Sequence, residues 1–250
     1  MHSEIAQRLK LRYPPIAILV SSEKPQEALE FKEGSWACVA AMLTAAAKGS
    51  QVVFSRTTFG CEGGGIGLGF IKEYSEGMES FLSTGEGKLP EIFKTRESEG
   101  FKKSPELAKS WMGSIPSISV PEAYIVFKPL PKVDLAKEDP KVIVFYANPD
   151  QLTALIVLAN YGRSGHDNVI APFAAGCQST CLFPWSEATA KQPKAVIGMT
   201  DISVRPRIDP DLLSFSVPYV MFKEMEENVP GSFLDKHEWK KLAERTPDNS

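Results

Sequence analysis

Four cysteines are the side chains in this 250-residue chain whose types and spacing best suit chemistry. Cys61 stands two residues before Gly63, the first residue of a stretch (63–69) in which five of seven residues are glycine. Cys177 and Cys181 lie four positions apart, so on a helix their thiols would share one face and could bind one metal ion. A thioredoxin-type redox pair needs two intervening residues rather than three, and the spacing therefore favours a metal site.

Together these thiols predict a metal- or iron–sulfur-binding protein. The predicted ligands are Cys38, Cys61, Cys177 and Cys181. Four thiolates are a complete ligand set for an iron–sulfur cluster or a closed zinc site. Glycines beside a ligand would let the backbone approach the inorganic sulfides of a cluster and donate N–H bonds to them. The glycines expected to form this wall are Gly60, Gly63, Gly64 and Gly65. An iron–sulfur cluster is thus the expected cofactor, with zinc or no metal as the alternatives.

A metal-free interpretation stays open, in which the glycine-rich run binds a small anionic ligand. The run does not match a nucleotide P-loop, because Phe70 and Ile71 follow Gly69 where a Lys-Ser/Thr pair is needed. Consecutive glycines can still turn several N–H groups toward an anion. The guanidinium groups of Arg56 and Arg205 would then add positive charge. A third interpretation is a structural homo-oligomer whose four cysteines are all core residues. None of the three decides whether the protein is an enzyme.

Composition limits the partners that such a site can have. The net charge is −3, the pI is about 5.8, and the basic residues are not clustered. Nucleic acid and acidic membrane surfaces are therefore not expected as partners, since both need a basic face. The longest apolar stretch, about 152–161, is far shorter than the roughly 20 residues of a membrane-spanning helix. Residues 1–15 lack the apolar core of a signal peptide. We expect a cytoplasmic protein that binds a small molecule or an inorganic cluster, with cysteines that are not disulfide-bonded.

The elements that must position these residues follow from hydrophobic patterns and helix end signals. The expected strands are 14–22, 51–59, 123–130 and 142–149, followed by a strand and turn over 194–206 and a last strand running into a helix over 212–222. A helix is predicted over 35–50, with Ser35 as its N-cap. A second helix is predicted over 150–162, with Asp150 as its N-cap and Gly162 as its stop.

Two further segments have a helical pattern without a clear place in the sheet. Residues 71–113 combine helical periodicity with many Ser, Glu and Gly residues, so we expect helices and loops packed outside the sheet. A terminal helix over 235–245 is expected to be exposed, with Trp239 and Leu242 on its apolar side. That apolar side would be available to a partner.

One arrangement occurs twice: a strand, a helix ending in glycine, a second strand and then Gly-Cys. It extends over 13–70 and again over 123–181, which suggests a pseudo-repeat. If the two halves are related, their Gly-Cys turns should lie at the same end of one sheet. We expect a single domain over residues 1–250 of the α/β or α+β class, with a mixed sheet and flanking helices.

Several separated motifs also resemble a known family. They are "PPIAILV", "ACVAAMLTAAAKG", "FGCEGGGIGLGF", "VIVFYANPDQLTALI", "AAGCQS" and "AVIGMTDISVRPRI", which cover roughly residues 12–220. In this order they resemble the domain of unknown function 169 family of archaea and anaerobic bacteria. The resemblance singles out Cys38, Cys61 and Cys177 with the glycines after Cys61, while Cys181 matches less securely. Three cysteine ligands with an open position would still suit a cluster, and an anaerobic distribution fits an oxygen-sensitive site.

Overall fold

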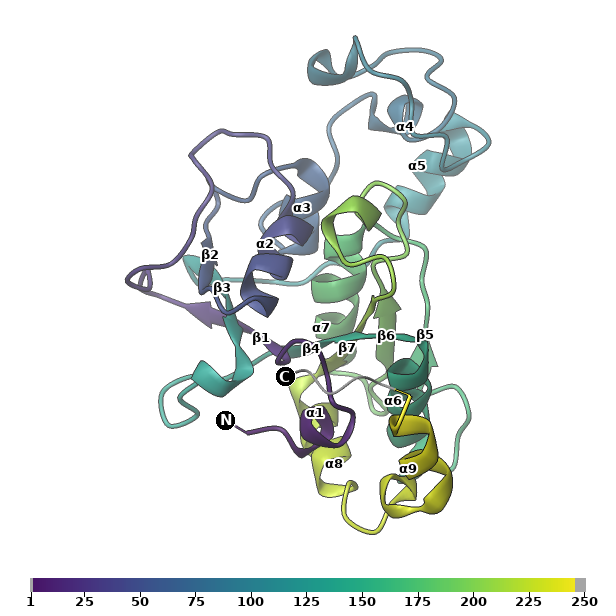
Figure 1. The fold of residues 1–250 in the computed structure, drawn as a ribbon. Helices are drawn as coiled ribbons and strands as arrows, with labels where there is room; N and C mark the ends of the chain where they lie inside the picture. Colours follow the sequence, from purple (N-terminus) through teal and green to yellow (C-terminus); the bar gives the residue numbers. More distant parts are fainter. Residues whose placement is uncertain (1, 246–250) are drawn as a thin grey trace.

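Seven strands within the described residues, 2–245, form one mixed sheet in this computed structural model (Figure 1). The strands are β1 (Ile16–Ser21), β2 (Val52–Phe54), β3 (Tyr124–Pro129), β4 (Val142–Ala147), β5 (Val169–Ile170), β6 (Ala195–Gly198) and β7 (Leu213–Pro218). They lie in the order β2-β3-β1-β4-β7-β6-β5, and every pairing is antiparallel except that of β5 with β6. The predicted mixed sheet with flanking helices is confirmed.

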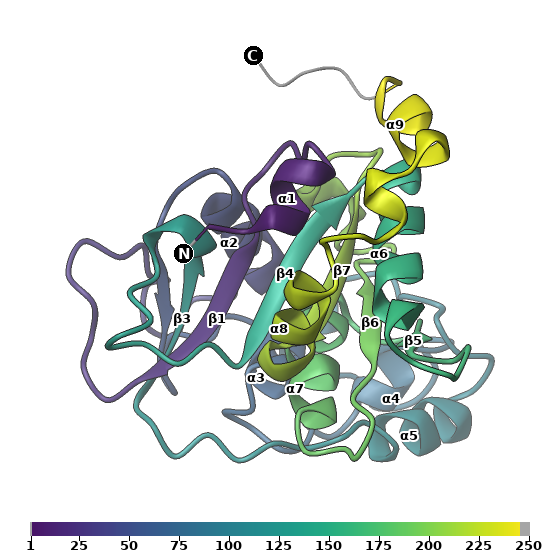
Figure 2. The same ribbon diagram turned by 90° about the horizontal axis from the view of Figure 1, so that it is seen from below.

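Helices cover both faces of this sheet (Figure 2). They are α1 (Glu4–Arg8), α2 (Val39–Ala47), α3 (Glu62–Gly67), α4 (Met78–Phe81), α5 (Pro105–Gly113), α6 (Pro149–Tyr161), α7 (Phe183–Glu187), α8 (Tyr219–Glu227) and α9 (His237–Ala243). Helices α1, α6, α8 and α9 pack on one face, and α2, α3 and α7 pack on the other. Along β1, Ala17 and Leu19 enter the first core while Ile16 and Ile18 enter the second, as expected for a strand buried on both faces. Within residues 2–245, none of the helices has the length and apolar character needed to cross a membrane.

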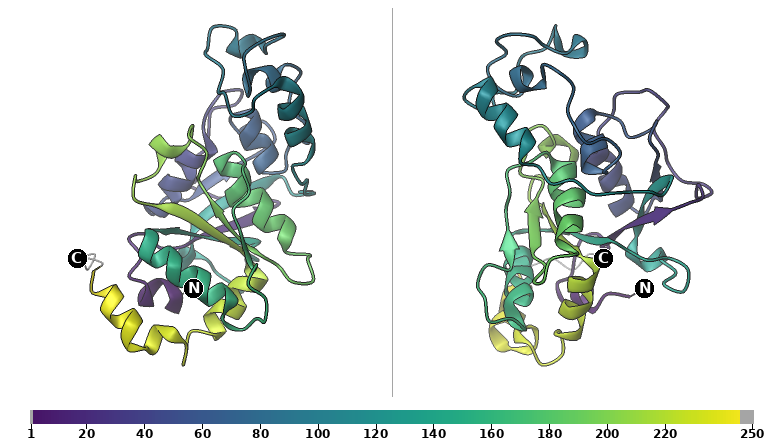
Figure 3. Two further views of the ribbon diagram at one scale, coloured as in Figure 1. Left: turned by 90° about the vertical axis from the view of Figure 1, so that its right-hand side faces the viewer. Right: turned by 180° about the vertical axis from the view of Figure 1, so that it is seen from behind.

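Residues 71–113 form a helical extension that stands apart from the sheet, at the top of Figure 1 and of both views in Figure 3. The extension contains α4, α5 and a small core in which Met78, Phe81, Leu82 and Phe93 are buried. The rings of Phe81 and Phe93 stack with their centroids 3.9 Å apart. Because it has its own apolar core, the extension can hold its shape without joining the sheet.

The predicted start of α2 at Ser35 is wrong. The helix begins after Cys38, which is its N-cap residue. The Ser35 hydroxyl instead donates to the carbonyl of Lys32 at 2.6 Å. The carbonyl of Ala37 accepts from the N–H of Cys61 at 3.0 Å, which holds the chain before α2 in a non-helical connection. A tertiary contact therefore displaces the local cap signal.

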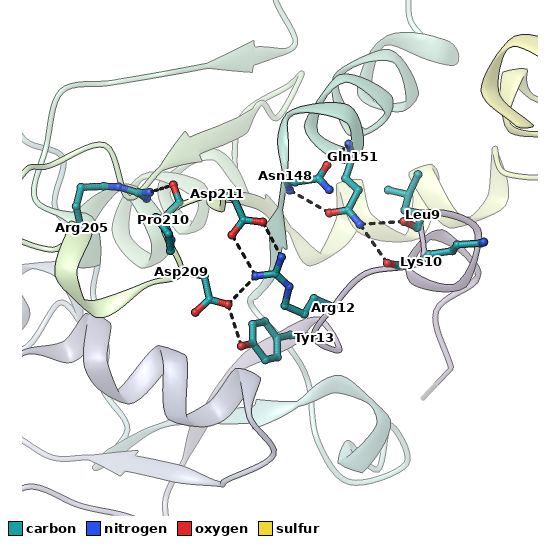
Figure 4. Close-up of polar contacts among 10 residues, drawn as sticks. All are labelled: Leu9, Lys10, Arg12, Tyr13, Asn148, Gln151, Arg205, Asp209, Pro210 and Asp211. Atoms are coloured by element: carbon teal, nitrogen blue, oxygen red, sulfur yellow. Dashed lines mark hydrogen bonds and ion pairs between the residues drawn. The ribbon is translucent and has the colours of Figure 1, made fainter. Parts of the chain in front are cut away.

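The start of α6 also differs from the prediction, since Asn148 and not Asp150 is the N-cap (Figure 4). The Asn148 side chain accepts from the N–H of Gln151 at 2.9 Å, and the Gln151 side chain accepts from the N–H of Asn148 at 3.0 Å. This reciprocal capping box begins the helix two residues earlier than expected. The Gln151 amide also donates to the carbonyls of Leu9 (3.0 Å) and Lys10 (3.1 Å), which fastens the end of α1 to α6.

The apolar side of α9 is not exposed in the way that the pattern suggested. Trp239 is only 7% exposed and packs in the core that α9 shares with α1, α6 and α8. Its ring meets the ring of Phe233 edge-on at 6.1 Å, because a short turn before α9 folds back over it. Leu242 is partly buried against the same core. This side of the helix is thus occupied by the protein itself.

A charged network holds the loop over 199–212, which joins β6 to β7 (Figure 4). The Arg12 guanidinium donates to Asp209 at 2.9 Å and to Asp211 at 2.6 Å, and the Tyr13 hydroxyl donates to Asp209 at 2.9 Å. The hydrogen bonds from Arg12 lower the pKa of both carboxyl groups. The N-terminal segment thereby fixes a loop whose first residues reach the candidate site.

The β7 hydroxyl of Ser216 generates a stability prediction. This buried side chain faces the second core and has no hydrogen-bond partner within residues 2–245. An unpaired buried hydroxyl is destabilising, so Ser216→Ala should raise the free energy of unfolding by about 1 kcal/mol in urea denaturation. Ser214→Ala is the matched control, because the Ser214 hydroxyl lies 3.4 Å from that of Thr180 and its loss should not stabilise. A lower stability for Ser216→Ala would contradict the prediction.

Candidate functional site

Three of the four cysteines stand at helix N-termini on the same side of the sheet. Cys38 precedes α2, Cys61 precedes α3, and Cys177 precedes a π-helical segment, Gln178–Leu182, that leads into α7. Cys181 lies within the π-helical segment and is buried. Burial raises the pKa of the Cys177 thiol, and the charges of the other three thiols would raise it further. The predicted ligands therefore lie in one region of the fold.

A single peptide group lies between two of these thiols. The Cys177 thiol donates to the carbonyl of Gly63 at 3.0 Å, and the N–H of Gly64 donates to the Cys61 sulfur at 3.3 Å. The carbonyl and N–H of this trans peptide point in opposite directions. The two sulfurs consequently lie on opposite sides of the Gly63–Gly64 peptide. A disulfide needs the two sulfurs about 2.05 Å apart, and a shared metal ion needs each sulfur within about 2.3 Å of the metal. Neither arrangement fits two sulfurs with a peptide group between them.

The four cysteines are not gathered into a ligand set within the described residues. No group of three or more His, Cys, Asp or Glu residues between positions 2 and 245 has the geometry to hold a metal ion. All four cysteines are free. Burial raises the pKa of Cys61, and the hydrogen bond from Gly64 opposes that shift without cancelling it. Burial also raises the pKa of Cys181.

Most of the predicted glycine wall is used for packing within the protein. Gly60 has φ +81°, and a Cβ there would lie 2.4 Å from the carbonyl oxygen of Ala37. A Cβ at Gly64 or Gly65 would come within 2.7 to 2.8 Å of Phe59. Gly63 differs, because its nearest neighbours to a Cβ would be at 3.7 Å or more. It is the one member of the predicted wall (Gly60, Gly63, Gly64 and Gly65) that faces open space in a cavity.

The two predicted anion-binding arginines are engaged with backbone carbonyls. Arg56 donates to the carbonyl of Phe70 at 3.2 Å and to that of Val120 at 2.6 Å. Arg205 donates to the carbonyl of Leu212 at 2.7 Å and to that of Pro210 at 2.9 Å (Figure 4). Both guanidinium groups fasten loops, and neither residue lines the cavity beside Cys61.

That cavity lies between the start of α3 and the helical extension, with a volume of about 130 Å³. Its aromatic walls are Trp36, Tyr74, Phe81, Phe93, Phe101, Trp111 and Phe173. Trp36 meets Phe93 edge-on at 6.4 Å on one side, and Trp111 lies 5.2 Å from Phe173 on another. The Cys61 thiol belongs to the same lining. The site is thus mainly apolar, with a thiol at the end of a helix.

A few polar groups line the cavity among the rings. Asp201 is buried, and its carboxylate accepts from the N–H (2.9 Å) and the hydroxyl (3.0 Å) of Ser203. Partial burial raises the pKa of Glu99, the Asp201 charge raises it further, and Arg96 lowers it. Glu62 accepts hydrogen bonds from the backbone and the side chain of Ser75, near the start of the extension.

Nearly all of these lining residues were not predicted from the sequence. Trp36 and Phe173 are separated from the helical extension by long stretches of chain, and no motif joins them. Five aromatic residues lie within residues 71–113: Tyr74, Phe81, Phe93, Phe101 and Trp111. This proportion is similar to the 10% of the whole chain, so their number gave no signal of a ligand site.

Comparison with known proteins places most of this chain within one family. The sequence pattern of domain of unknown function 169, described as uncharacterised ArCR, matches residues 4–228. No curated protein and no solved structure matches the chain.

Substitution of two glycines of α3 should have different effects on stability. A Cβ at Gly67 would lie 2.9 Å from the carbonyl carbon of Cys177, so Gly67→Ala should lower the free energy of unfolding by about 1–3 kcal/mol through overpacking. Gly63→Ala adds a methyl group at ordinary contact distance and should leave stability within about 1 kcal/mol of the original. Denaturant unfolding measures both, and equal effects of the two substitutions would contradict the packing role of Gly67.

Proposed function

Because the chain belongs to the domain of unknown function 169 family, described only as uncharacterised, we propose its function from the site itself. The protein binds a small organic molecule in the aromatic cavity between α3 and the helical extension, with the Cys61 thiol in the wall. The observation that carries this proposal is the cavity of about 130 Å³, lined by rings from three separate parts of the chain. Binding sites for small molecules are typically concave and apolar, with a few placed polar groups.

The position of the thiols supports binding in preference to thiolate chemistry. A cysteine nucleophile needs a depressed pKa and usually an adjacent base. Burial instead raises the pKa of Cys61. A neutral thiol can contact an apolar ligand at little desolvation cost. Cys61 therefore acts as part of the wall in this proposal.

The hydrogen bonds of the two predicted arginines argue against their use in binding an anionic ligand. The earlier expectation used Arg56 and Arg205, whose guanidinium groups donate to backbone carbonyls within loops. Recruiting either one would leave buried carbonyl groups without their partners, which is costly. The proposed ligand is therefore held by the rings and polar groups of the cavity.

Tryptophan indole signals provide a test with internal controls. Trp36 and Trp111 line the cavity, whereas Trp185 and Trp239 pack elsewhere. In ¹H–¹⁵N spectra of the full chain, we expect members of a set of small amines, alcohols and carboxylates to shift the indole signals of Trp36 and Trp111. The signals of Trp185 and Trp239 should stay in place. If no compound moves the first pair selectively, the proposed function is wrong.

A metal- or iron–sulfur-binding function is the second candidate, favoured by the position of Cys38, Cys61 and Cys177 at three helix N-termini on the same side of the sheet. Under this candidate the ligands are Cys38, Cys61 and Cys177, with Cys181 as a fourth. The Cys61 and Cys177 sulfurs would have to leave the Gly63–Gly64 peptide that separates them. Metal binding would also have to drive their deprotonation, since the ligands are thiolates.

Anaerobic reconstitution with iron and sulfide, followed by visible absorption and metal analysis, tests this candidate. It predicts bound iron and a visible chromophore that Cys61→Ser and Cys177→Ser each diminish. Ser83→Ala changes a buried serine of the helical extension whose hydroxyl donates to the carbonyl of Glu79, and it serves as a control that should keep both. A colourless and metal-free product would exclude the cluster, and zinc analysis of the anaerobically purified protein covers the alternative metal.

A further inference from the structure

The ring faces around the cavity already attract positive charge from the protein itself. The Arg96 guanidinium carbon lies 4.9 Å from the centroid of the Trp36 ring. The Lys102 ammonium lies 4.8 Å from the centroid of Phe173 and 5.3 Å from that of Trp111. All three distances are within the roughly 6 Å over which a cation is drawn to the face of a ring. Two separate walls of the cavity thus consist of rings that favour cations.

Carboxylates outnumber cations among the lining residues. Glu62, Glu99 and Asp201 line the cavity. Against these three carboxylates stand two cations, Arg96 in the lining and Lys102 beside the rings of Trp111 and Phe173. Asp201 is 5% exposed, and its hydrogen-bond donors on Ser203 are uncharged. Arg96 is exposed, so water screens its charge more than it screens that of Asp201. Asp201 has a larger effect than Arg96 on the Glu99 pKa, which reflects the same imbalance.

We propose that this cavity binds a small organic cation, specifically a quaternary ammonium compound about the size of choline. The inference rests on the proposed function and adds its ligand class. A quaternary ammonium group cannot donate a strong hydrogen bond, so its recognition depends on ring faces and on unpaired negative charge. The cavity supplies both, through Trp36, Trp111 and Phe173 and through Asp201. Its volume of about 130 Å³ is close to that of an enclosed cavity of roughly 150 Å³ that holds benzene. Because this cavity is open to solvent, the trimethylammonium group can enter it while the hydroxyethyl end of choline extends toward the opening.

Four compounds of nearly equal shape test the charge of the ligand. Choline carries a trimethylammonium group, and 3,3-dimethylbutan-1-ol is its neutral isostere. Glycine betaine adds a carboxylate to the cation, and 3,3-dimethylbutanoate carries the carboxylate alone. Isothermal titration of the full chain should give choline the lowest Kd, about tenfold below that of the neutral alcohol.

Two substitutions separate the ring and charge contributions. Asp201→Asn keeps an acceptor for Ser203 but removes the charge, so it should weaken choline binding several-fold and leave the alcohol unaffected. Trp111→Leu removes a ring face and should weaken choline more than the alcohol. Glu227→Gln makes the same change in net charge on α8, on the opposite face of the sheet, and should leave both affinities unchanged. Circular dichroism and thermal unfolding verify that each variant is folded.

The outcomes distinguish this inference from the function on which it rests. Equal affinity for choline and the alcohol, or tighter binding of betaine or dimethylbutanoate, would overturn the organic-cation inference and leave the cavity as a binding site. Binding of none of the four compounds would also overturn it. In that case, indole shifts of Trp36 and Trp111 with other compounds would preserve the binding function, and their absence would remove both.

Discussion

The close approach of α3 to the start of the π-helical segment is the contact on which the site depends. A side chain at Gly67 would meet the backbone of Cys177 at 2.9 Å, so the two segments touch without an intervening side chain. That approach brings the Cys177 thiol within 3.0 Å of the Gly63 carbonyl. Because protein interiors are close-packed, a displacement of α3 would move the thiols and the adjoining wall of the cavity together. The glycine-rich run is thus a packing feature that determines where the site can form.

The peptide between Cys61 and Cys177 gives the two candidate functions different energetic requirements. A thiol that donates to the Gly63 carbonyl polarises the amide, which strengthens the bond from the Gly64 N–H to the Cys61 sulfur. Binding of an organic ligand leaves this chain of hydrogen bonds intact. Metal binding needs both sulfurs as thiolates close to one metal. A thiolate cannot donate, so the bond from Cys177 to the Gly63 carbonyl is lost, and one sulfur must also move past the peptide within a largely buried region. The energy of the metal–sulfur bonds would have to exceed both costs.

Short apolar runs predicted the sheet well because they are a local property, as in Val142–Ala147, which is apolar throughout and whose alternate residues enter the two cores. The caps expected at Ser35 and Asp150 were wrong because several polar or small residues near each helix start compete. Which residue becomes the N-cap depends on contacts with distant segments, as before α2, and on which side chains can form a reciprocal cap, as in α6. The cavity could not be predicted from the sequence for a related reason. Trp36 and Phe173 reach it from opposite parts of the chain, and no spacing rule connects residues that meet only after folding.

The attachments of the helical extension decide how rigid the cavity is. The Trp111 indole N–H donates to the carbonyl of Phe173 at 2.9 Å, which joins α5 to the segment before the π-helical turn. At the other end of the extension, the Tyr74 hydroxyl accepts from the Gln178 amide at 2.6 Å. The stacked rings within the extension keep its own shape between these two points. A wall fastened at both ends has little conformational entropy left to lose when a ligand binds, and such preorganisation increases affinity without any additional contact. In the proposed binding function, the extension would therefore contribute through its attachments as well as through its rings.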